Sequence, residues 1–378
     1  MSSYREVLKQ MDKRAKEKRL ARELRARGDD GRELWFNCGL RIRAESGAWL
    51  IPLLVNRRPT AYGEDWLLSL PVGLCEADIR RKAPKLAGAL GGEVEFQRVN
   101  DLLLMRVMTQ PIQNAYPFEL VDRGRMCVPV PVGYGRAGLV VLDLSTAPHL
   151  LVGGTPGFGK SAFLHQAAAT MLHHGVLLYV IDLKRLEFAY LKDYARVVTT
   201  EPQGVELLQA LCAEMERRLE YLERAGVVKI QDMETPEMPY ICVVVDELAE
   251  IQAEEFFALL NRLVRLCRAV GISIIAATQR PSVKVVDGDT RAMFTARLCY
   301  QAADELNSRM ILGEQNPQAA YLPAISGRGI YRFGNVTQEV QTMFLPVAGA
   351  RELLSGVEQQ PVLPAPAPEP EPEIITMT

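Results

Sequence analysis

The chain is poor in the residues that build metal and disulfide sites. Its 378 residues include four histidines and seven widely spaced cysteines, and no two cysteines form a C-x-x-C pair. An odd number of scattered cysteines predicts neither a disulfide framework nor a zinc site, and the adjacent His173 and His174 would diverge on a helix. The cysteine pattern therefore indicates a reducing compartment.

Long apolar runs and an excess of either charge are also lacking. No run approaches the roughly 18 apolar residues that cross a bilayer, and the N-terminus lacks the apolar core of a signal peptide. We therefore expect a cytoplasmic protein without a transmembrane segment, brought to a membrane only by a partner. Because the 44 basic and 46 acidic residues nearly cancel, any nucleic-acid surface must be a local patch.

Charge and proline are instead concentrated at the two ends of the chain. Residues 1–30 are expected to form a basic helical arm, since residues 1–28 hold ten Lys and Arg against four acids. Such an arm is either solvated or in contact with phosphates or a partner. Residues 349–378 are expected to form a disordered Pro/Glu-rich tail, which either solubilises the protein or docks on a partner.

Two different patterns fill the middle of the chain. Residues 31–110 combine short strands with one amphipathic helix over 75–92, which predicts a small α+β domain. Residues 111–131 are expected to act largely as a connector. Residues 111–348 as a whole are expected to form a larger α/β domain.

Within this larger domain, apolar runs of strand length alternate with helical stretches from about residue 149 to residue 345. Runs that are apolar on both faces predict a mainly parallel sheet buried between helices. A final alternating stretch over 336–345 is expected to add an edge strand. The helix predicted over 205–222 has an apolar stripe, with Glu214, Arg217 and Arg218 expected elsewhere on its surface.

A glycine-rich turn separates the first buried strand from the helix that follows it. The turn fits the GxxxxGKS phosphate-binding pattern without a gap, and this placement favours a phosphate site over a flexible bend. Its backbone N–H groups can surround a β-phosphate, Lys160 can reach the β- and γ-oxygens, and Ser161 can hold Mg²⁺. The predicted cofactors are ATP and Mg²⁺, bound by Gly154, Thr155, Pro156, Gly157, Phe158, Gly159, Lys160 and Ser161.

Polar side chains follow two further buried strands. Asp246 and Glu247 end the strand YICVVV, which places one carboxylate near the metal and the other near the attacking water. The structural alternative is a helix N-cap followed by an acid in the first turn. Gln279 follows the strand IIAAT, where it can hydrogen-bond the γ-phosphate or water, or simply cap the strand. We therefore predict Lys160, Glu247 and Gln279 as catalytic residues and Asp246 as a metal ligand.

Four stretches of the chain resemble the ATPase domain of the FtsK/SpoIIIE DNA translocases, in the HerA/FtsK branch of RecA-like P-loop motors. They are, in order, PHLLVGGTPGFGKS, IDLKRLEFAY, EMERRLEYL and TQRPSVKVVDGDTRAMFTARLCYQAADELNSRMIL. The resemblance covers roughly Pro117 to Leu345. With neither membrane helices nor a winged helix expected beside it, the chain resembles soluble members from plasmids, integrative elements and phages. It departs from the family pattern at Pro156, Phe158, Leu183, Met293 and Asn307.

This resemblance implies a homo-oligomeric ring, expected to be a hexamer, with ATP between neighbouring subunits and double-stranded DNA in the channel. An arginine of the next subunit would neutralise charge on the γ-phosphate. Arg297 is the first choice and Arg309 the second, each with a structural ion pair as the alternative. Lys284 and Arg291 lie in the segment that approaches DNA in this family, where they contact phosphates or stay solvated.

Three functions remain open at this point. The first is an ATP-driven pump for double-stranded DNA in transfer, mobilisation or segregation, with a relaxase, recombinase or membrane-channel protein as partner. The second is an ATPase of the same fold that powers protein or single-stranded DNA export at a secretion or conjugation channel. The third is a nucleotide-dependent scaffold that hydrolyses ATP slowly.

Overall fold

The computed structural model describes residues 31–233, 238–279, 281 and 288–360. The chain divides into two units between Pro111 and Ile112, except that Arg136–Gly138 also belong to the first unit. The basic arm over 1–30, Lys284 and residues 361–378 of the predicted tail lie outside the described residues. None of the helices that are described combines the length and the apolar character needed to cross a bilayer.

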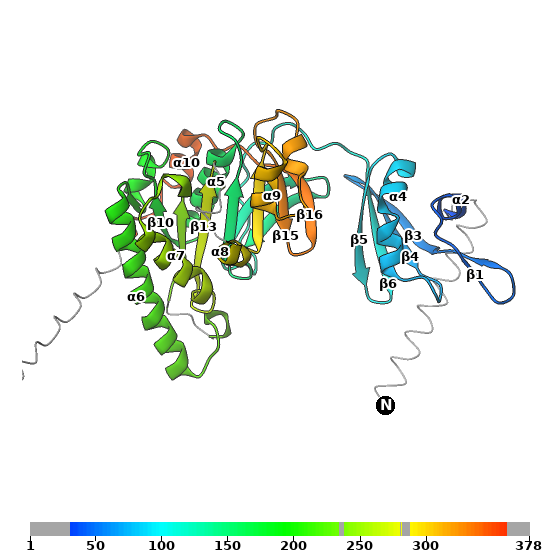
Figure 1. The fold of residues 1–378 in the computed structure, drawn as a ribbon, viewed down its shortest axis with the longest axis horizontal. Helices are drawn as coiled ribbons and strands as arrows, with labels where there is room; N and C mark the ends of the chain where they lie inside the picture. The colour runs from blue at the N-terminus through cyan, green and yellow to red at the C-terminus, as the bar shows by residue number, and fades with distance from the viewer. Residues whose placement is uncertain (1–30, 234–237, 280, 282–287, 361–378) are drawn as a thin grey trace, which may run out of the picture. The chain divides into compact units, whose positions relative to one another are not determined.

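The first unit is a small antiparallel sheet with helices (Figure 1). Its elements are α2 (Arg32–Asn37), β1 (Ile42–Arg43), β2 (Trp49–Leu50), β3 (Leu53–Thr60), β4 (Gly63–Ser69), α3 (Glu76–Arg81), α4 (Ala83–Leu90), β5 (Glu93–Val99) and β6 (Leu102–Met108). The four longer strands pair in the order β3-β4-β6-β5. The single helix predicted over 75–92 was wrong. It is divided at Lys82, because Pro84 lacks a backbone N–H and occupies the first turn of α4.

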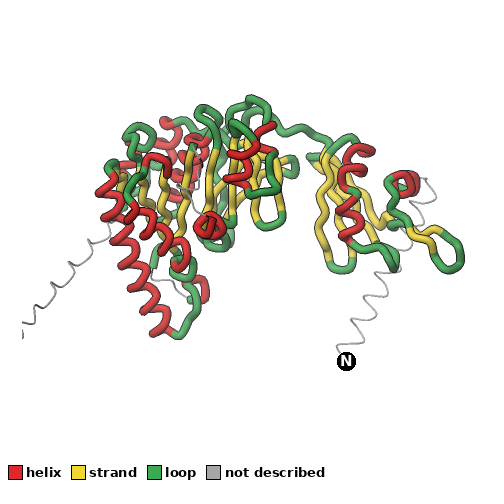
Figure 2. Tube along the Cα trace, in the orientation of Figure 1, coloured by secondary structure: helices red, strands yellow, loops and turns green. Residues whose placement is uncertain are grey.

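The second unit contains a sheet of ten strands (Figure 2). They are β7 (Pro129–Gly135), β8 (Gly138–Asp143), β9 (His149–Gly153), β10 (Leu177–Ile181), β11 (Arg196–Val198), β12 (Ile241–Val245), β13 (Ile272–Thr278), β14 (Ala296–Tyr300), β15 (Arg328–Phe333) and β16 (Val336–Gln341). Their order is β11-β10-β12-β13-β9-β14-β15-β16-β7-β8, parallel from β11 to β14 and antiparallel from β14 to β7.

Helices cover both faces of this sheet. They are α5 (Lys160–His173), α6 (Glu201–Ala225), α7 (Glu254–Leu266), α8 (Gly288–Met293), α9 (Glu305–Leu312) and α10 (Val347–Leu353), with short 3-10 turns η1 (Ala189–Asp193), η2 (Ile230–Asp232), η3 (Leu248–Glu250) and η4 (Gln318–Tyr321). Leu150 and Val152 of β9 pack in the same core as α5, whereas Leu151 packs in the core formed with α6 and α7. Strands that are buried on both faces confirm the predicted α/β architecture.

Two predictions about the sheet were wrong. β16 is not an edge strand, because it pairs with β15 on one side and with β7 on the other. β7 itself falls partly within the predicted connector. Its prolines fit this place because β7 and β16 share a single register pair, Tyr134 with Gln341, so few N–H groups are needed there.

Arg218 also differs from the expectation that it lies on the surface of α6. Its side chain is 1% exposed, with Nε donating to Glu214 Oε1 at 2.7 Å and Nη1 donating to the carbonyl of Val270 at 2.9 Å. A buried guanidinium is tolerated when its N–H groups find acceptors, and the partner at residue 270 is remote in the sequence.

The C-terminal segment is ordered further than predicted. Residues 349–353 belong to α10, which packs against α5, so the predicted start of a disordered tail at residue 349 was wrong. Beyond this helix, the side chain of Gln360 accepts from Leu178 N at 2.7 Å and donates to Val176 O at 2.6 Å. These bonds tie the segment to the start of β10.

Candidate nucleotide-binding site

Three parallel strands bring the predicted site residues to one edge of the sheet. β12 pairs with β13, and β13 pairs with β9, so that their carboxyl ends lie side by side. The glycine-rich turn follows β9, Asp246 and Glu247 follow β12, and Gln279 follows β13. Ligands of open α/β sheets bind at this edge.

The glycine-rich turn takes a shape that side chains would prevent. Gly154 has φ +145°, and a Cβ there would lie 2.7 Å from Cβ of Tyr300. Gly159 has φ +112°, and its Cβ would lie 2.7 Å from Cα of Gly327. Thr155 donates its N–H and hydroxyl to the carbonyl of Gln301 at 2.8 and 2.9 Å, which fixes the start of the turn.

The rest of the turn leads directly into α5. Pro156 and Gly157 are exposed and Phe158 is half-buried, so the middle of the turn is open to a ligand. α5 begins at Lys160, close to the predicted start at Ser161. The positive end of this 14-residue helix therefore lies at the turn, where it favours an anionic group.

Lys160 contacts both carboxylate residues that follow β12. The lysine is 4% exposed, and its Nζ donates to the backbone carbonyl of Asp246 at 2.6 Å and to Oδ1 of the same residue at 2.7 Å. Oε2 of Glu247 lies 4.0 Å from the same nitrogen. Lys160 must exchange these contacts to bind a phosphate.

Glu247 is held from two further sides. Its Oε1 and Oε2 accept the backbone N–H of Gln279 at 2.9 and 3.1 Å, and Nζ of Lys184 lies 3.6 Å from Oε2. Lys184 was not among the site residues predicted from the sequence. The signal was its place in IDLKRLEFAY, one of the stretches that carry the family resemblance, but no partner residue was apparent in the sequence.

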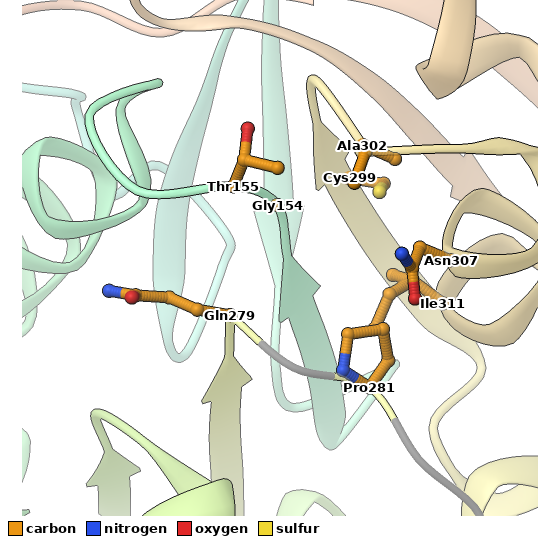
Figure 3. A pocket seen from close by; sticks show the side chains of 9 residues that line it. Gly154, Thr155, Gln279, Pro281, Cys299, Ala302, Asn307 and Ile311 are labelled. Carbon is orange, nitrogen blue, oxygen red and sulfur yellow. The ribbon is translucent and has the colours of Figure 1, made fainter.

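Gln279 and the start of the turn also line a small cavity of about 20 Å³ (Figure 3). Gly154 and Thr155 form one part of its wall, and Asn307 and Ile311 of α9 lie across from Gln279. A cavity of this size holds about one water molecule. In Figure 3 the amide group of Gln279 is directed away from Asn307 and Ile311.

The oxygen atoms near Lys160 fit a magnesium ion. Asp246 is 2% exposed, and within the described residues only its Oδ1, not Oδ2, takes part in a side-chain hydrogen bond. Ser161 follows Lys160 in the first turn of α5 and is half-buried. A carboxylate and a hydroxyl are oxygen ligands that Mg²⁺ accepts together with phosphate oxygens.

Arg297 lies at the opposite edge of the sheet, at the start of β14. Its guanidinium donates to the carbonyls of Phe294 at 2.9 Å, Ile311 at 3.3 Å and Arg291 at 2.8 Å. Burial, with Arg332 and Arg291 nearby, lowers the pKa of Arg297 to about 10.

The other two described arginines named from the sequence are also engaged. Arg309 pairs with Glu305 at 2.6 Å along α9, as its structural alternative anticipated. Arg291 in α8 donates to the carbonyl of Met310 at 3.4 Å. Neither lies in the turn that would bind the phosphates.

Arg297 shares a pocket with two arginines that were not predicted from the sequence. The pocket has a volume of about 440 Å³, and we call it the arginine pocket. Arg297 and Arg332 are direct cross-strand partners, an unfavourable arrangement for like charges, and Arg268 is exposed beside them. Among the described residues, none of these three arginines forms an ion pair with a carboxylate. The pocket is lined by Thr146, Arg268, Ala292, Thr295, Arg297, Arg332, Phe333 and Gly334.

Comparisons with known proteins agree with this geometry. The FtsK/SpoIIIE family profile matches residues 111–235, which include the glycine-rich turn. The DNA translocase FtsK of Chlorobaculum tepidum is 30% identical over 304 residues, 73% of this chain and 36% of the relative. The DNA translocase FtsK of Treponema pallidum is 34% identical over 239 residues, 58% of this chain and 29% of the relative. The chain thus spans about a third of these curated relatives.

A solved structure shows the same fold. The pCW3 conjugation coupling protein TcpA, in its monomer form with ATPγS, superposes with a TM-score of 0.61. The match has 24% identity and covers 86% of this chain and 96% of that chain. The likeness confirms the predicted RecA-like P-loop fold. Residues 111–235 of the chain thus carry an FtsK/SpoIIIE family domain, in agreement with the similarity to these translocases.

Proposed function

We propose that the chain is an ATPase that translocates double-stranded DNA as a homo-oligomeric ring, expected to be a hexamer. The observation that carries the proposal is the convergence of Lys160, Asp246 and Glu247, with Nζ of the lysine within 4.0 Å of both carboxylates. Similarity to proteins named DNA translocases supports DNA as the substrate. The proposed cellular role of this motor is DNA transfer, mobilisation or segregation.

Nucleotide binding rearranges the contacts of Lys160. Its Nζ leaves Oδ1 of Asp246 and contacts the β- and γ-phosphates, while N–H groups of the turn surround the β-phosphate. Asp246 and Ser161 are then free to hold Mg²⁺, which neutralises charge on the phosphate oxygens when it is bound. The exchange replaces a buried ion pair with contacts to a phosphate anion, so the charge of Lys160 stays compensated.

Hydrolysis depends on Glu247. Its carboxylate accepts a proton from the attacking water as the water oxygen bonds to the γ-phosphorus and the bond to the β–γ bridging oxygen breaks. The products are ADP and inorganic phosphate. Gln279 lies beside Glu247, where its side chain can hydrogen-bond the water or the γ-phosphate.

The arginine pocket supplies the cation that a neighbouring subunit would add to this site. Arg297 uses N–H groups of Nε and both terminal nitrogens on backbone carbonyls, and Arg309 is paired with Glu305. Arg268 is exposed and forms no ion pair or side-chain hydrogen bond within the described residues. We therefore favour Arg268 over Arg297 as the residue that reaches the γ-phosphate of the next subunit, with Arg297 fixing the wall of the pocket.

The rate of ATP hydrolysis with and without duplex DNA tests the proposal. We expect duplex DNA to raise the rate and Lys160→Ala or Glu247→Gln to abolish it. Parallel reactions with single-stranded DNA separate duplex translocation from single-strand export. A rate that ignores both nucleic acids would count against a DNA motor, and a slow rate in all conditions would favour the scaffold.

A further inference from the structure

A tight turn after β10 is built around one buried carboxylate. Asp182 is fully buried, and its carboxylate accepts the backbone N–H groups of Arg185 at 3.0 Å and Phe188 at 3.2 Å. Arg185 also takes φ +65°, a conformation that is costly for a residue with a side chain. Such a conformation persists only where the surroundings impose it, and here both hydrogen bonds of Asp182 do so.

This turn directs Lys184 at Glu247. The lysine side chain is 34% exposed, whereas Glu247 is 4% exposed, and Nζ lies 3.6 Å from Oε2. Glu247 is the only carboxylate within ion-pair distance of Lys184 among the described residues. The lysine therefore reaches from the solvent side into a buried site to meet the carboxylate that activates water.

The far end of the same turn contacts the helix that starts at the phosphate-binding turn. Oε2 of Glu187 lies 3.4 Å from Nε2 of His165 in α5, and Nδ1 of His165 lies 3.1 Å from the hydroxyl of Tyr190. The turn is thus held at both ends, and Lys184 lies on a supported segment rather than on a free loop.

Lys160 cannot hold Glu247 through the whole reaction cycle. Its hydrogen bonds go to Asp246, and its Nζ is required at the phosphates once nucleotide binds. The remaining contacts of Glu247 are the N–H of Gln279 and the ammonium of Lys184. Of these two, only Lys184 can compensate the charge of the carboxylate.

We propose that Lys184 is a positioning residue that holds Glu247 toward the attacking water, and that Asp182 fixes the turn from which it acts. The inference rests on the proposed ATP hydrolysis and adds a residue to its machinery. Lys184 acts through Glu247 and not through the nucleotide. Removing it is therefore expected to lower kcat for ATP while leaving nucleotide binding intact.

The test compares the full-length wild-type chain with Lys184→Ala. We expect kcat to fall about 10-fold or more, while the affinity for a fluorescent ATP analogue changes less than about twofold. Lys184→Arg, which keeps the positive charge, should recover part of the loss. Lys192→Ala is the matched control, because Lys192 is an exposed lysine of the neighbouring η1 without an ion pair in the described chain.

A second variant separates the turn from the charge. Asp182→Asn leaves Lys184 in place but replaces one carboxylate oxygen with a donor, so one backbone N–H loses its acceptor. It should lower kcat in the same way, and the double variant with Lys184→Ala should be no slower than the slower single variant. Additive losses would contradict a shared route through Glu247.

Several results would overturn the proposal. One is a kcat of Lys184→Ala within about twofold of the wild-type kcat. A second is a loss of nucleotide affinity in Lys184→Ala as large as its loss of kcat. A third is a kcat of Lys184→Arg as low as that of Lys184→Ala. Failure of the proposed function gives a different result. Wild-type hydrolysis that duplex DNA does not stimulate removes translocation but leaves the comparison of variants valid, whereas wild-type protein without hydrolysis removes both proposals.

Discussion

The two edges of the ten-stranded sheet are formed by the carboxyl ends and by the amino ends of its parallel strands. They differ in how their charged side chains are paired. At the carboxyl edge, Lys160 and Lys184 face the carboxylates of Asp246 and Glu247, so cations and anions are matched within one subunit. At the amino edge, the arginine pocket gathers like charges without a carboxylate partner among the described residues. In the proposed function, the first edge binds and hydrolyses the nucleotide, and the second receives an anion from a neighbouring subunit.

This difference gives a physical reason for the proposed assembly into a ring. Uncompensated guanidinium groups in a half-enclosed pocket repel one another, and a phosphate from a neighbour would relieve that repulsion. A ring in which the amino edge of one subunit meets the carboxyl edge of the next would satisfy both.

The largest effect is expected at the carboxyl edge. Glu247→Gln keeps the size of the side chain but removes the proton acceptor, so ATP hydrolysis should fall by roughly 10³-fold or more, measured as phosphate release. Binding of a fluorescent ATP analogue should persist in this variant and be lost in Lys160→Ala. Hydrolysis by Glu247→Gln at near wild-type rate would contradict the role given to the carboxylate.

The second-largest effect is expected for removal of Arg268, which tests the amino edge. Arg268→Ala should lower kcat by roughly 10²-fold or more, with nucleotide affinity retained, because the missing cation acts on the site of another subunit. Mixing this variant with Lys160→Ala should restore activity, since each supplies what the other lacks. Arg265→Ala is the matched control, because this α7 arginine is exposed and lines no part of the arginine pocket. Mixtures that stay inactive would mean that Arg268 does not act between subunits.

A smaller effect is expected for alanine substitutions at two glycines of the glycine-rich turn, and its size should differ between them. Gly157 and Gly159 both have positive φ, but a Cβ at Gly157 meets nothing within 4 Å, whereas one at Gly159 would lie 2.7 Å from Cα of Gly327. Gly159→Ala should therefore lower the free energy of unfolding by about 1–3 kcal/mol and weaken nucleotide binding, with a smaller change for Gly157→Ala. Urea unfolding measures the first quantity, and equal losses would show that the backbone angle alone decides.

The smallest effect is expected for His149, which lies at the start of β9 on the amino edge and contributes to the pH dependence of stability. Burial, with a minor contribution from Arg268, lowers the pKa of His149 to about 4, below the value of about 6.5 in an unfolded chain. The unfolded state then binds more protons, so stability is full above pH ~6.5 and decreases as pH falls toward ~4, by on the order of 3 kcal/mol. Urea unfolding of His149→Gln should show a flatter pH dependence, and an unchanged slope would assign the loss to other groups.

The convergence of Lys160, Asp246, Glu247 and Gln279 at the carboxyl edge could be predicted because the sequence signals are local. The phosphate-binding turn, the strand before Asp246 and the strand before Gln279 are each contiguous, and parallel pairing then brings their ends together. The amino edge had no such signal, since Arg268 and Arg332 come from separate segments that meet only in the folded sheet.

The features that were predicted wrongly or missed also depend on contacts between distant segments. Arg218 is buried because Val270 supplies a carbonyl from a distant segment, and β16 is internal because β7 pairs beside it despite its prolines. Lys184 lay in a family-like stretch, yet its partner Glu247 follows a different strand. Periodicity and composition predict the secondary structure of a single segment. Its burial and its pairing depend on residues that are remote in the sequence.

The most direct test of the account measures ATP hydrolysis by the wild-type chain with and without duplex DNA, beside an equimolar mixture of Arg268→Ala and Lys160→Ala. The account predicts that duplex DNA accelerates hydrolysis by the wild type, and that the mixture regains DNA-stimulated activity that neither variant has alone. Hydrolysis that is the same with and without DNA, together with an inactive mixture, would contradict a DNA-driven motor whose sites are completed between subunits.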